Sequence, residues 1–355
     1  MARHLRECSV AASTLTKYRR HWARWLAFCA SIAVDPLLRS VPVSSHVDIV
    51  SDFILSLSRV RGAASAGLRS SSLSSVLHGI NHFFRACGLA FPISHPQICM
   101  LLKGLSRLDP PPRSKAPVSL ALLGACFRRL DFALPQDQAL WGVLCLSFFF
   151  LLRRSEIVAE NAIFKRFALR ADDVVVLDAH GFPTMEAQAA VSVCISLRGS
   201  KTDQQGKGAS RLLSRSGHRC ICPVFGALLL KHCHGSLPGS WPIAVVQGPV
   251  SPIVLSVQDV SEIIKSAAVD LGESAKSYGT HSLRIGGATQ LYKAGVDSTT
   301  IQFQGRWVSD AFKRYTRLSL EVSSKLSEAM LSGSGDNTTI DHLASMLHAL
   351  RGQSR

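Results

Sequence analysis

The chain has 355 residues, 47% of them hydrophobic, which is enough for two domains that each bury a core. Its 40 Lys and Arg residues outnumber 24 Asp and Glu residues, so the formal charge is +16, which favours a polyanion such as nucleic acid over an anionic membrane surface. The most apolar run, residues 139–152, is shorter than the roughly 20 residues of a membrane-spanning helix, which predicts a buried core helix instead.

The N-terminus and the cysteines indicate an intracellular protein. The first ten residues, MARHLRECSV, contain no apolar signal-peptide core. The 10 cysteines are scattered without regular spacing, which favours reduced and mostly buried thiols.

Four helical patterns occupy residues 1–108. Each has apolar residues at three- and four-residue spacing, and Gly88 is suited to end the third. The patterns cover residues 15–29, 47–57, 70–87 and 98–105. They predict a compact all-α domain with a basic surface.

A proline-rich segment, residues 109–117, interrupts these patterns. It holds 4 prolines in 9 residues, which cannot continue a helix and favour an extended linker. We expect a second domain over residues 118–320, followed by a tail, residues 321–355, whose amphipathic stretch 340–350 is a candidate oligomerisation segment. Within this domain and its continuation the patterns predict helices at 119–130, 137–152, 223–234, 257–271, 282–294, 297–304 and 310–317, and strands at 173–177 and 190–197.

Arg153 is the first candidate for chemistry, at the polar end of the long apolar helix. The sequence there is Arg153-Arg154-Ser155-Glu156. A rigid core helix can project a guanidinium, although two arginines at a helix C-terminus also simply favour the helix dipole.

Lys201 is the second candidate, in the polar turn Ser200-Lys201-Thr202-Asp203 that follows a β-rich run. A solvated turn lysine is the plain alternative. On chemistry alone Lys207 competes equally with Lys201.

His281 and Arg284 stand three residues apart at the start of a predicted helix and therefore share one face. A helix N-terminus favours an anion. The pair Gly286-Gly287 predicts close approach of another backbone segment.

Trp307 and Tyr315 complete the set. An indole N–H can donate to a phosphate oxygen, although a Trp is more often simply buried. Tyr315 lies between Arg314 and Arg317, and a phenol with a pKa near 10 needs a base or nearby cations to become a nucleophile.

Taken in order, these residues resemble the catalytic residues of the tyrosine recombinases, the phage-integrase family. The resemblance covers about 165 residues by motif. It implies a mainly α fold with a small β-sheet: an N-terminal all-α core-binding (SAM-like) domain and a mixed α/β catalytic domain, forming a C-shaped clamp around DNA.

The resemblance also implies a role for each residue. Arg153 and Arg284 would hold the scissile phosphate, with Glu156 orienting Arg153. His281 would take the proton from the nucleophile Tyr315, Lys201 would protonate the leaving 5′ oxygen in preference to Lys207, and Trp307 would steady the phosphate. Arg306 stays open as an alternative to Trp307, because its distance from the tyrosine is closer to the family's usual offset.

The implied function is strand cleavage and rejoining through a 3′-phosphotyrosyl link, giving site-specific recombination or integration. The implied partner is double-stranded DNA, with a homotetramer acting on two duplexes, no membrane, and no metal or nucleotide cofactor. The protein would be intracellular and with DNA, in the nucleus if it comes from a eukaryotic mobile element.

Two alternatives remain open. A type IB topoisomerase would use similar residues, and a catalytically silent DNA-binding protein could keep the same fold. A plain helical interaction protein is a more distant reading. Separately, a zinc site could be assembled, although its ligand spacing departs from the common patterns. Its candidate ligands would be Cys220, Cys222, His232, Cys233 and His234.

Overall fold

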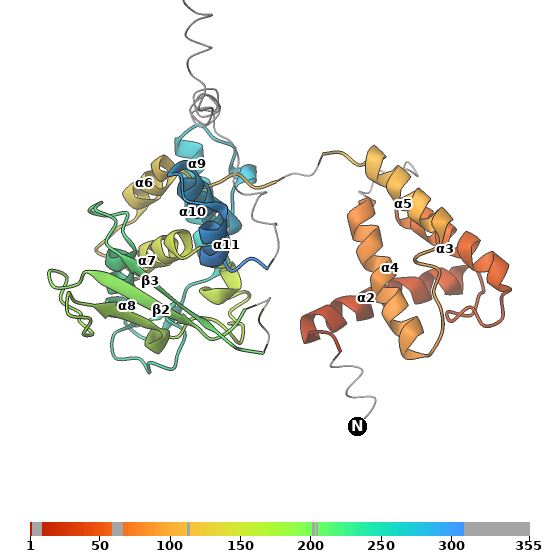
Figure 1. Cartoon of the computed structure of the whole chain (residues 1–355), viewed down its shortest axis with the longest axis horizontal. Helices are drawn as coiled ribbons and strands as arrows, with labels where there is room; N and C mark the ends of the chain where they lie inside the picture. The colour runs from red at the N-terminus through yellow and green to blue at the C-terminus, as the bar shows by residue number, and fades with distance from the viewer. Residues whose placement is uncertain (2–8, 59–66, 112–113, 201–202, 204, 309–355) are drawn as a thin grey trace, which may run out of the picture. The chain divides into compact units, whose positions relative to one another are not determined.

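The computed structural model describes residues 1, 9–58, 67–111, 114–200, 203 and 205–308 (Figure 1). The chain divides into two compact units, Met1–Pro112 and Arg113–Arg355. The division falls inside the proline-rich segment 109–117. Each unit has a hydrophobic core of its own.

The described part of the first unit is a small helical bundle. Its helices are α2 (Ala12–Ser31), α3 (Val43–Leu57), α4 (Ser70–Ala86) and α5 (Pro96–Leu108). Trp25 lies in its core in edge-to-face contact with Phe53 and Phe91, and its indole N–H donates to the Pro36 carbonyl at 2.7 Å. The four helices predicted from apolar spacing are confirmed.

Helix α7 (Pro135–Phe149) is the centre of the second unit and is buried along most of its length. It packs against α8 (Pro223–His234) through two glycines, since a Cβ added to Gly142 would lie 2.5 Å from the Gly226 carbonyl oxygen. None of the helices in the described residues is long and apolar enough to cross a membrane. The apolar run therefore belongs to a core helix, as predicted.

The predicted end of this helix is wrong by three residues. The helix stops at Phe149, and Leu151 adopts a left-handed conformation with φ of 50°. Arg153 therefore does not end α7. It precedes a separate 3-10 turn, η1 (Arg154–Glu156), as its N-cap.

A small antiparallel sheet covers one side of the second unit (Figure 1). Its strands are β1 (Val174–Leu177), β2 (Ser192–Leu197) and β3 (Ala209–Ser214), in the order β1-β2-β3. In the register, Val174 pairs with Ile195, which pairs with Arg211. The strand β3 was not predicted. Every second residue of this edge strand is exposed and the others are only half-buried, so its sequence lacks a strongly apolar face.

The rest of the described second unit is mostly helical. It comprises α6 (Leu120–Arg129), η2 (Ala171–Asp173), the short strands β4 (Val245–Val246) and β5 (Ile253–Val254), α9 (Val257–Asp270), η3 (Ala275–Ser277), α10 (His281–Lys293) and α11 (Ser298–Gly305). The predicted mainly α fold with a small sheet is confirmed. The predicted helix 310–317 and the tail 321–355 lie outside the described residues.

Candidate active site

Helix α10, which begins with His281, is held by close backbone contacts on two sides. A Cβ on Gly286 would lie 2.2 Å from the Val118 carbonyl oxygen, and one on Gly287 would lie 2.1 Å from the Phe148 carbonyl oxygen. Any side chain at either position would push neighbouring backbone away. The predicted role of the two glycines is thus confirmed, and it gives α10 a defined position against α7.

The segment before α6 holds the start of α10 in place. The Lys115 ammonium donates to the carbonyls of Lys276 and Tyr278 at 2.8 and 2.9 Å. The Val118 amide donates to the Ser282 carbonyl at 3.0 Å. These contacts restrain the turn that presents His281.

Arg284 points from α10 into the turn after α7. Its two terminal nitrogens donate to the carbonyls of Leu151 and Gly305, and the residue is 1% exposed. The Trp307 ring stacks on its guanidinium, with 4.2 Å from Cζ to the ring centroid. The left-handed turn at Leu151 therefore supplies an acceptor to a guanidinium 133 residues further along the chain.

Glu156 binds Arg153, as expected. Its carboxylate accepts the Arg153 amide at 2.8 Å and the Arg153 side chain at 2.9 Å, which forms a capping box around η1. Arg154 turns outward instead and pairs with Glu160 at 3.0 Å on the surface. Of the two neighbouring arginines, Arg153 is thus the one that joins the cluster.

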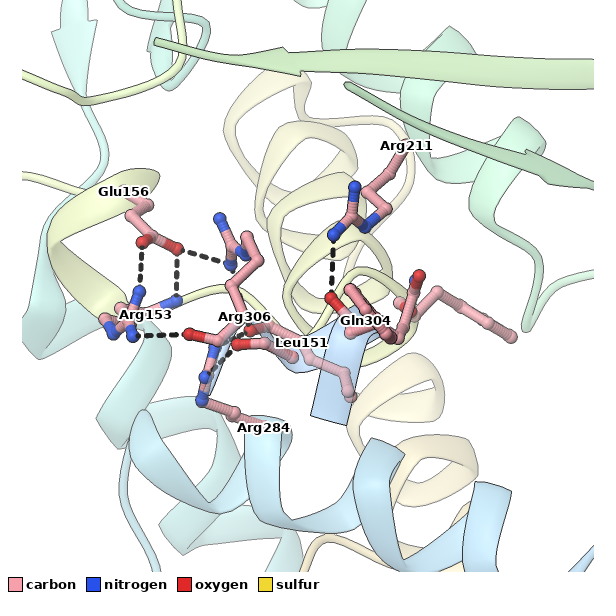
Figure 2. A network of polar contacts seen from close by, with 10 residues as sticks. Leu151, Arg153, Glu156, Arg211, Arg284, Gln304 and Arg306 are labelled. Atoms are coloured by element: carbon pink, nitrogen blue, oxygen red, sulfur yellow. Dashed lines mark hydrogen bonds and ion pairs between the residues drawn. The ribbon is translucent and has the colours of Figure 1, made fainter. Parts of the chain in front are cut away.

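Arg306 joins the same cluster from the end of α11. It adopts φ of 56°, and its guanidinium donates to Glu156 at 2.9 Å and to the Leu151 carbonyl at 3.4 Å. Arg153 in turn donates to the Arg306 carbonyl at 3.4 Å. Figure 2 shows Arg153, Arg284 and Arg306 gathered around Glu156 and the turn at Leu151.

The charges of the cluster set its protonation states. Burial raises the pKa of Glu156, but Arg306 and the hydrogen bonds and charge of Arg153 outweigh this effect, so the pKa ends below its usual value. The surrounding residues partly shield His281 from water, which lowers its pKa. The positive charges of Arg284, Arg153 and Arg154 lower it further. Although His281 is exposed at the surface, it therefore favours the neutral form, which can accept a proton.

Lys201 and Tyr315, the predicted acid and nucleophile, lie outside the described residues. The backbones of Ser200 and Asp203 exchange two hydrogen bonds across the turn, at 3.0 and 3.1 Å. The Asp203 carboxylate accepts the amides of Gly206, Lys207 and Gly208. Lys207, the competitor of Lys201, is exposed.

Arg211 is a basic residue near the cluster that the sequence patterns did not single out. It lies on β3, and its guanidinium donates to the Phe303 carbonyl at 2.7 Å, near the end of α11 (Figure 2). Burial is the main cause that lowers the pKa of Arg306, and the positive charges of Arg153 and Arg211 lower it further. No local signal marks it, because the link between β3 and α11 depends on tertiary structure.

The five residues considered for zinc make other contacts or lie apart. His234 interacts through its two ring nitrogens with the carbonyls of Val245 and Pro238, at 2.7 and 3.2 Å. Cys233 donates to the Gln138 side chain at 3.6 Å. No group of three His, Cys, Asp or Glu side chains in the described ranges could hold a metal ion.

The fold of the chain is similar to that of solved recombinase and integrase structures. A fragment of the Tn1549 transposon integrase in complex with transposon right-end DNA is 15% identical, with 93% of this chain and 98% of that chain covered, at a TM-score of 0.52. The XerH site-specific recombinase bound to a palindromic difH substrate is 15% identical, with 80% and 68% covered, at 0.48. XerA recombinase is 14% identical, with 88% and 98% covered, at 0.38.

No protein-family profile matches the chain, and no curated protein sequence matches it. At 15% identity the likeness to the Tn1549 integrase concerns the path of the chain, not the chemistry of the site. The helical unit, the small antiparallel sheet and the buried α7 agree with that likeness. The chain therefore has the fold of the tyrosine recombinases and integrases.

Proposed function

We propose that the protein is a DNA strand transferase of the tyrosine-recombinase type. The observation that carries this proposal is the meeting of Arg153 and Arg284, from distant parts of the sequence, at the turn after α7. Two planar guanidinium groups suit the non-bridging oxygens of a phosphodiester better than point charges do. They also offset the negative charge that develops as the phosphate is attacked.

In the proposed reaction the Tyr315 oxygen attacks the scissile phosphorus and forms a new O–P bond. The bond from phosphorus to the 5′ oxygen breaks, and its electron pair stays on that oxygen. His281 takes the phenol proton, and Lys201 gives a proton to the departing 5′ oxygen. The number of phosphoester bonds is unchanged, so a 5′-hydroxyl can reverse the reaction and reseal a strand.

The proposal assigns a task to each part of the chain. Residues 1–108 would bind duplex DNA, residues 118–320 would carry the reaction, and the tail 321–355 would contact a second copy in a homotetramer on two duplexes. The formal charge of +16 is consistent with phosphate contacts along DNA. The protein would act inside the cell, in the nucleus if its element is eukaryotic.

A catalytically silent DNA-binding protein is the second candidate, and one observation favours it. Arg284 is 1% exposed and donates to two backbone carbonyls, which is also how an arginine serves a purely structural role. In that case Arg284 would tie α10 to the turns at Leu151 and Gly305 and would contact no substrate.

Covalent capture separates the two candidates. The full-length protein is incubated with nicked duplexes, one pool from its genomic flanks and one pool with randomised sequence. An enzyme gives a slow-migrating, protease-sensitive adduct, and Tyr315→Phe loses this adduct while its affinity for DNA is kept.

The absence of an adduct from both pools, together with normal DNA binding, would contradict the proposal and leave the silent binder. Relaxation of supercoiled plasmid without paired recognition sites would instead indicate a type IB topoisomerase.

A further inference from the structure

Arg306 has hydrogen-bond donors that no residue in the described part of the chain accepts. Its Nη2 donates to Glu156 and to Leu151, but its Nε and Nη1 are buried without a hydrogen-bond partner. Among the described residues, the other buried side-chain atom in this condition is His21 Nδ1, in the helical unit. Buried polar groups in native proteins are nearly always paired, so an unpaired edge of a guanidinium calls for a partner.

The backbone also places Arg306 here against its preference. Its φ of 56° and ψ of 45° lie in the left-handed region, where glycine or asparagine is usual. An arginine in this position puts its side chain beside Glu156 and the turn at Leu151. Strained residues that persist in a cluster of charges are typical of functional sites.

Arg306 shares acceptors with both arginines of the proposed site. Arg306 and Arg153 bind the two oxygens of Glu156, at 2.9 Å each. Arg306 and Arg284 both donate to the Leu151 carbonyl. Arg306 is therefore linked to Arg153 through the Glu156 carboxylate and to Arg284 through the Leu151 carbonyl.

We infer that Arg306 is a third phosphate-binding group, whose Nε and Nη1 edge receives a non-bridging oxygen of the scissile phosphodiester. This inference rests on the proposed strand-transfer function. It moves the sixth catalytic position from Trp307, the residue predicted from the sequence, to Arg306. The set would then carry three guanidinium groups where the sequence prediction has two.

Charge supports the inference. Three guanidinium groups and the one carboxylate that joins Arg153 to Arg306 give a net charge of +2. A phosphodiester carries one negative charge, and the five-coordinate arrangement formed during attack carries two. The cluster's charge of +2 thus balances the two negative charges of the transition state, whereas the substrate carries only one. Stabilising the transition state more than the substrate is what accelerates a reaction.

Trp307 has a different task in this arrangement. Its ring stacks on the Arg284 guanidinium and lies against Gly305, where an added Cβ would be 1.6 Å from the ring. These contacts make Trp307 a positioning residue that holds Arg284. Phenylalanine at this position keeps a ring for the same stacking.

The test compares a charged and a neutral scissile phosphate at a site found by covalent capture. One duplex carries a normal phosphodiester, and the other carries a methylphosphonate, in which a methyl group replaces one charged oxygen. We expect Arg306→Ala to slow single-turnover cleavage of the phosphodiester by about 100-fold or more, because it removes a donor to the developing charge. On the methylphosphonate, Arg306→Ala should cleave at nearly the rate of the wild-type protein on that same duplex, since the phosphate charge that the variant cannot neutralise is absent there.

Two further variants guard the result against a folding defect. Arg306→Lys keeps the positive charge beside Glu156 but loses the planar fork, and it should show a smaller loss that the methylphosphonate also rescues. It becomes the deciding variant if Arg306→Ala does not fold. Trp307→Phe should cleave both duplexes with the same ratio of rates as the wild type.

Equal losses on both duplexes for the arginine variants would overturn the inference, as would unchanged cleavage of the phosphodiester. A wild-type protein that forms no Tyr315 adduct contradicts the proposed function itself. A wild-type protein that forms the adduct, together with arginine variants that the neutral phosphate does not rescue, contradicts only the assignment of Arg306.

Discussion

Replacing Glu156 by glutamine should destabilise the second unit and separate its arginines. Glu156 is 2% exposed, and its carboxylate accepts three hydrogen bonds, one from the Arg153 amide and one from each of two guanidinium groups, at 2.8 to 2.9 Å. Glutamine has the same shape, but its amide nitrogen would face a donor on one side. The variant would leave Arg153 and Arg306 close together without their shared anion.

The expected loss follows from the burial of the partners. The side chains of Arg153 and Arg306 are 18% and 10% exposed, so water screens their charges only weakly. Removing one member of a buried ion pair costs about 3–5 kcal/mol of unfolding free energy. With a urea dependence of about 3 kcal/mol per molar for a unit of this size, the midpoint should fall by about 1–1.7 M.

Hydrogen exchange measured by mass spectrometry at increasing urea is the suitable assay, because it follows peptides of the two units separately. Glu160→Gln is the matched control. Its salt bridge with Arg154 joins side chains that are 42% and 51% exposed, so we expect a change below about 1 kcal/mol. Equal midpoints for the two variants would refute the reasoning.

The pH dependence gives a second test of the same group. The folded protein lowers the pKa of Glu156 below its ordinary value of 4.5. The stabilisation by its charged form is therefore complete above the unfolded pKa and is lost as pH falls through the folded pKa. The difference between wild type and Glu156→Gln should shrink over that acidic range.

Two further predictions concern helix α10. The rate of adduct formation should rise with pH to a plateau, with a midpoint below pH 6.5 because the pKa of His281 is lowered. Arg154→Gln should move this midpoint upward, since it removes a nearby positive charge. A wild-type midpoint above pH 6.5 would contradict the assignment of His281 as base. Gly287→Ala should lower the unfolding free energy by about 1–3 kcal/mol and abolish the adduct, because the new Cβ meets the Phe148 carbonyl. Gly124→Ala, whose Cβ meets only ordinary contact distances on helix α6, should be neutral or slightly stabilising, and an equal loss in both alanine variants would count against the packing argument.

Local pattern was sufficient for most helices and for the choice of fold class. Apolar residues at helical spacing report which face of a helix is buried, and this property is visible without knowing the partner. The order of Arg153, the pair His281 and Arg284, and Tyr315 along the chain resembles that of the tyrosine recombinases, and this order is visible in the sequence alone. Lys201 and Tyr315 remain predictions from the sequence.

Tertiary structure decided the features that depend on distant partners. The run Phe149-Phe150-Leu151-Leu152 is apolar throughout, so composition could not reveal the left-handed turn at Leu151 that ends α7. Sequence offset left Arg306 and Trp307 open, whereas the fold brings Arg306 to Glu156 and stacks Trp307 on Arg284. The spacing of apolar residues indicates which face of a helix or strand is buried. Which charged side chains meet in the interior depends on the path of the whole chain.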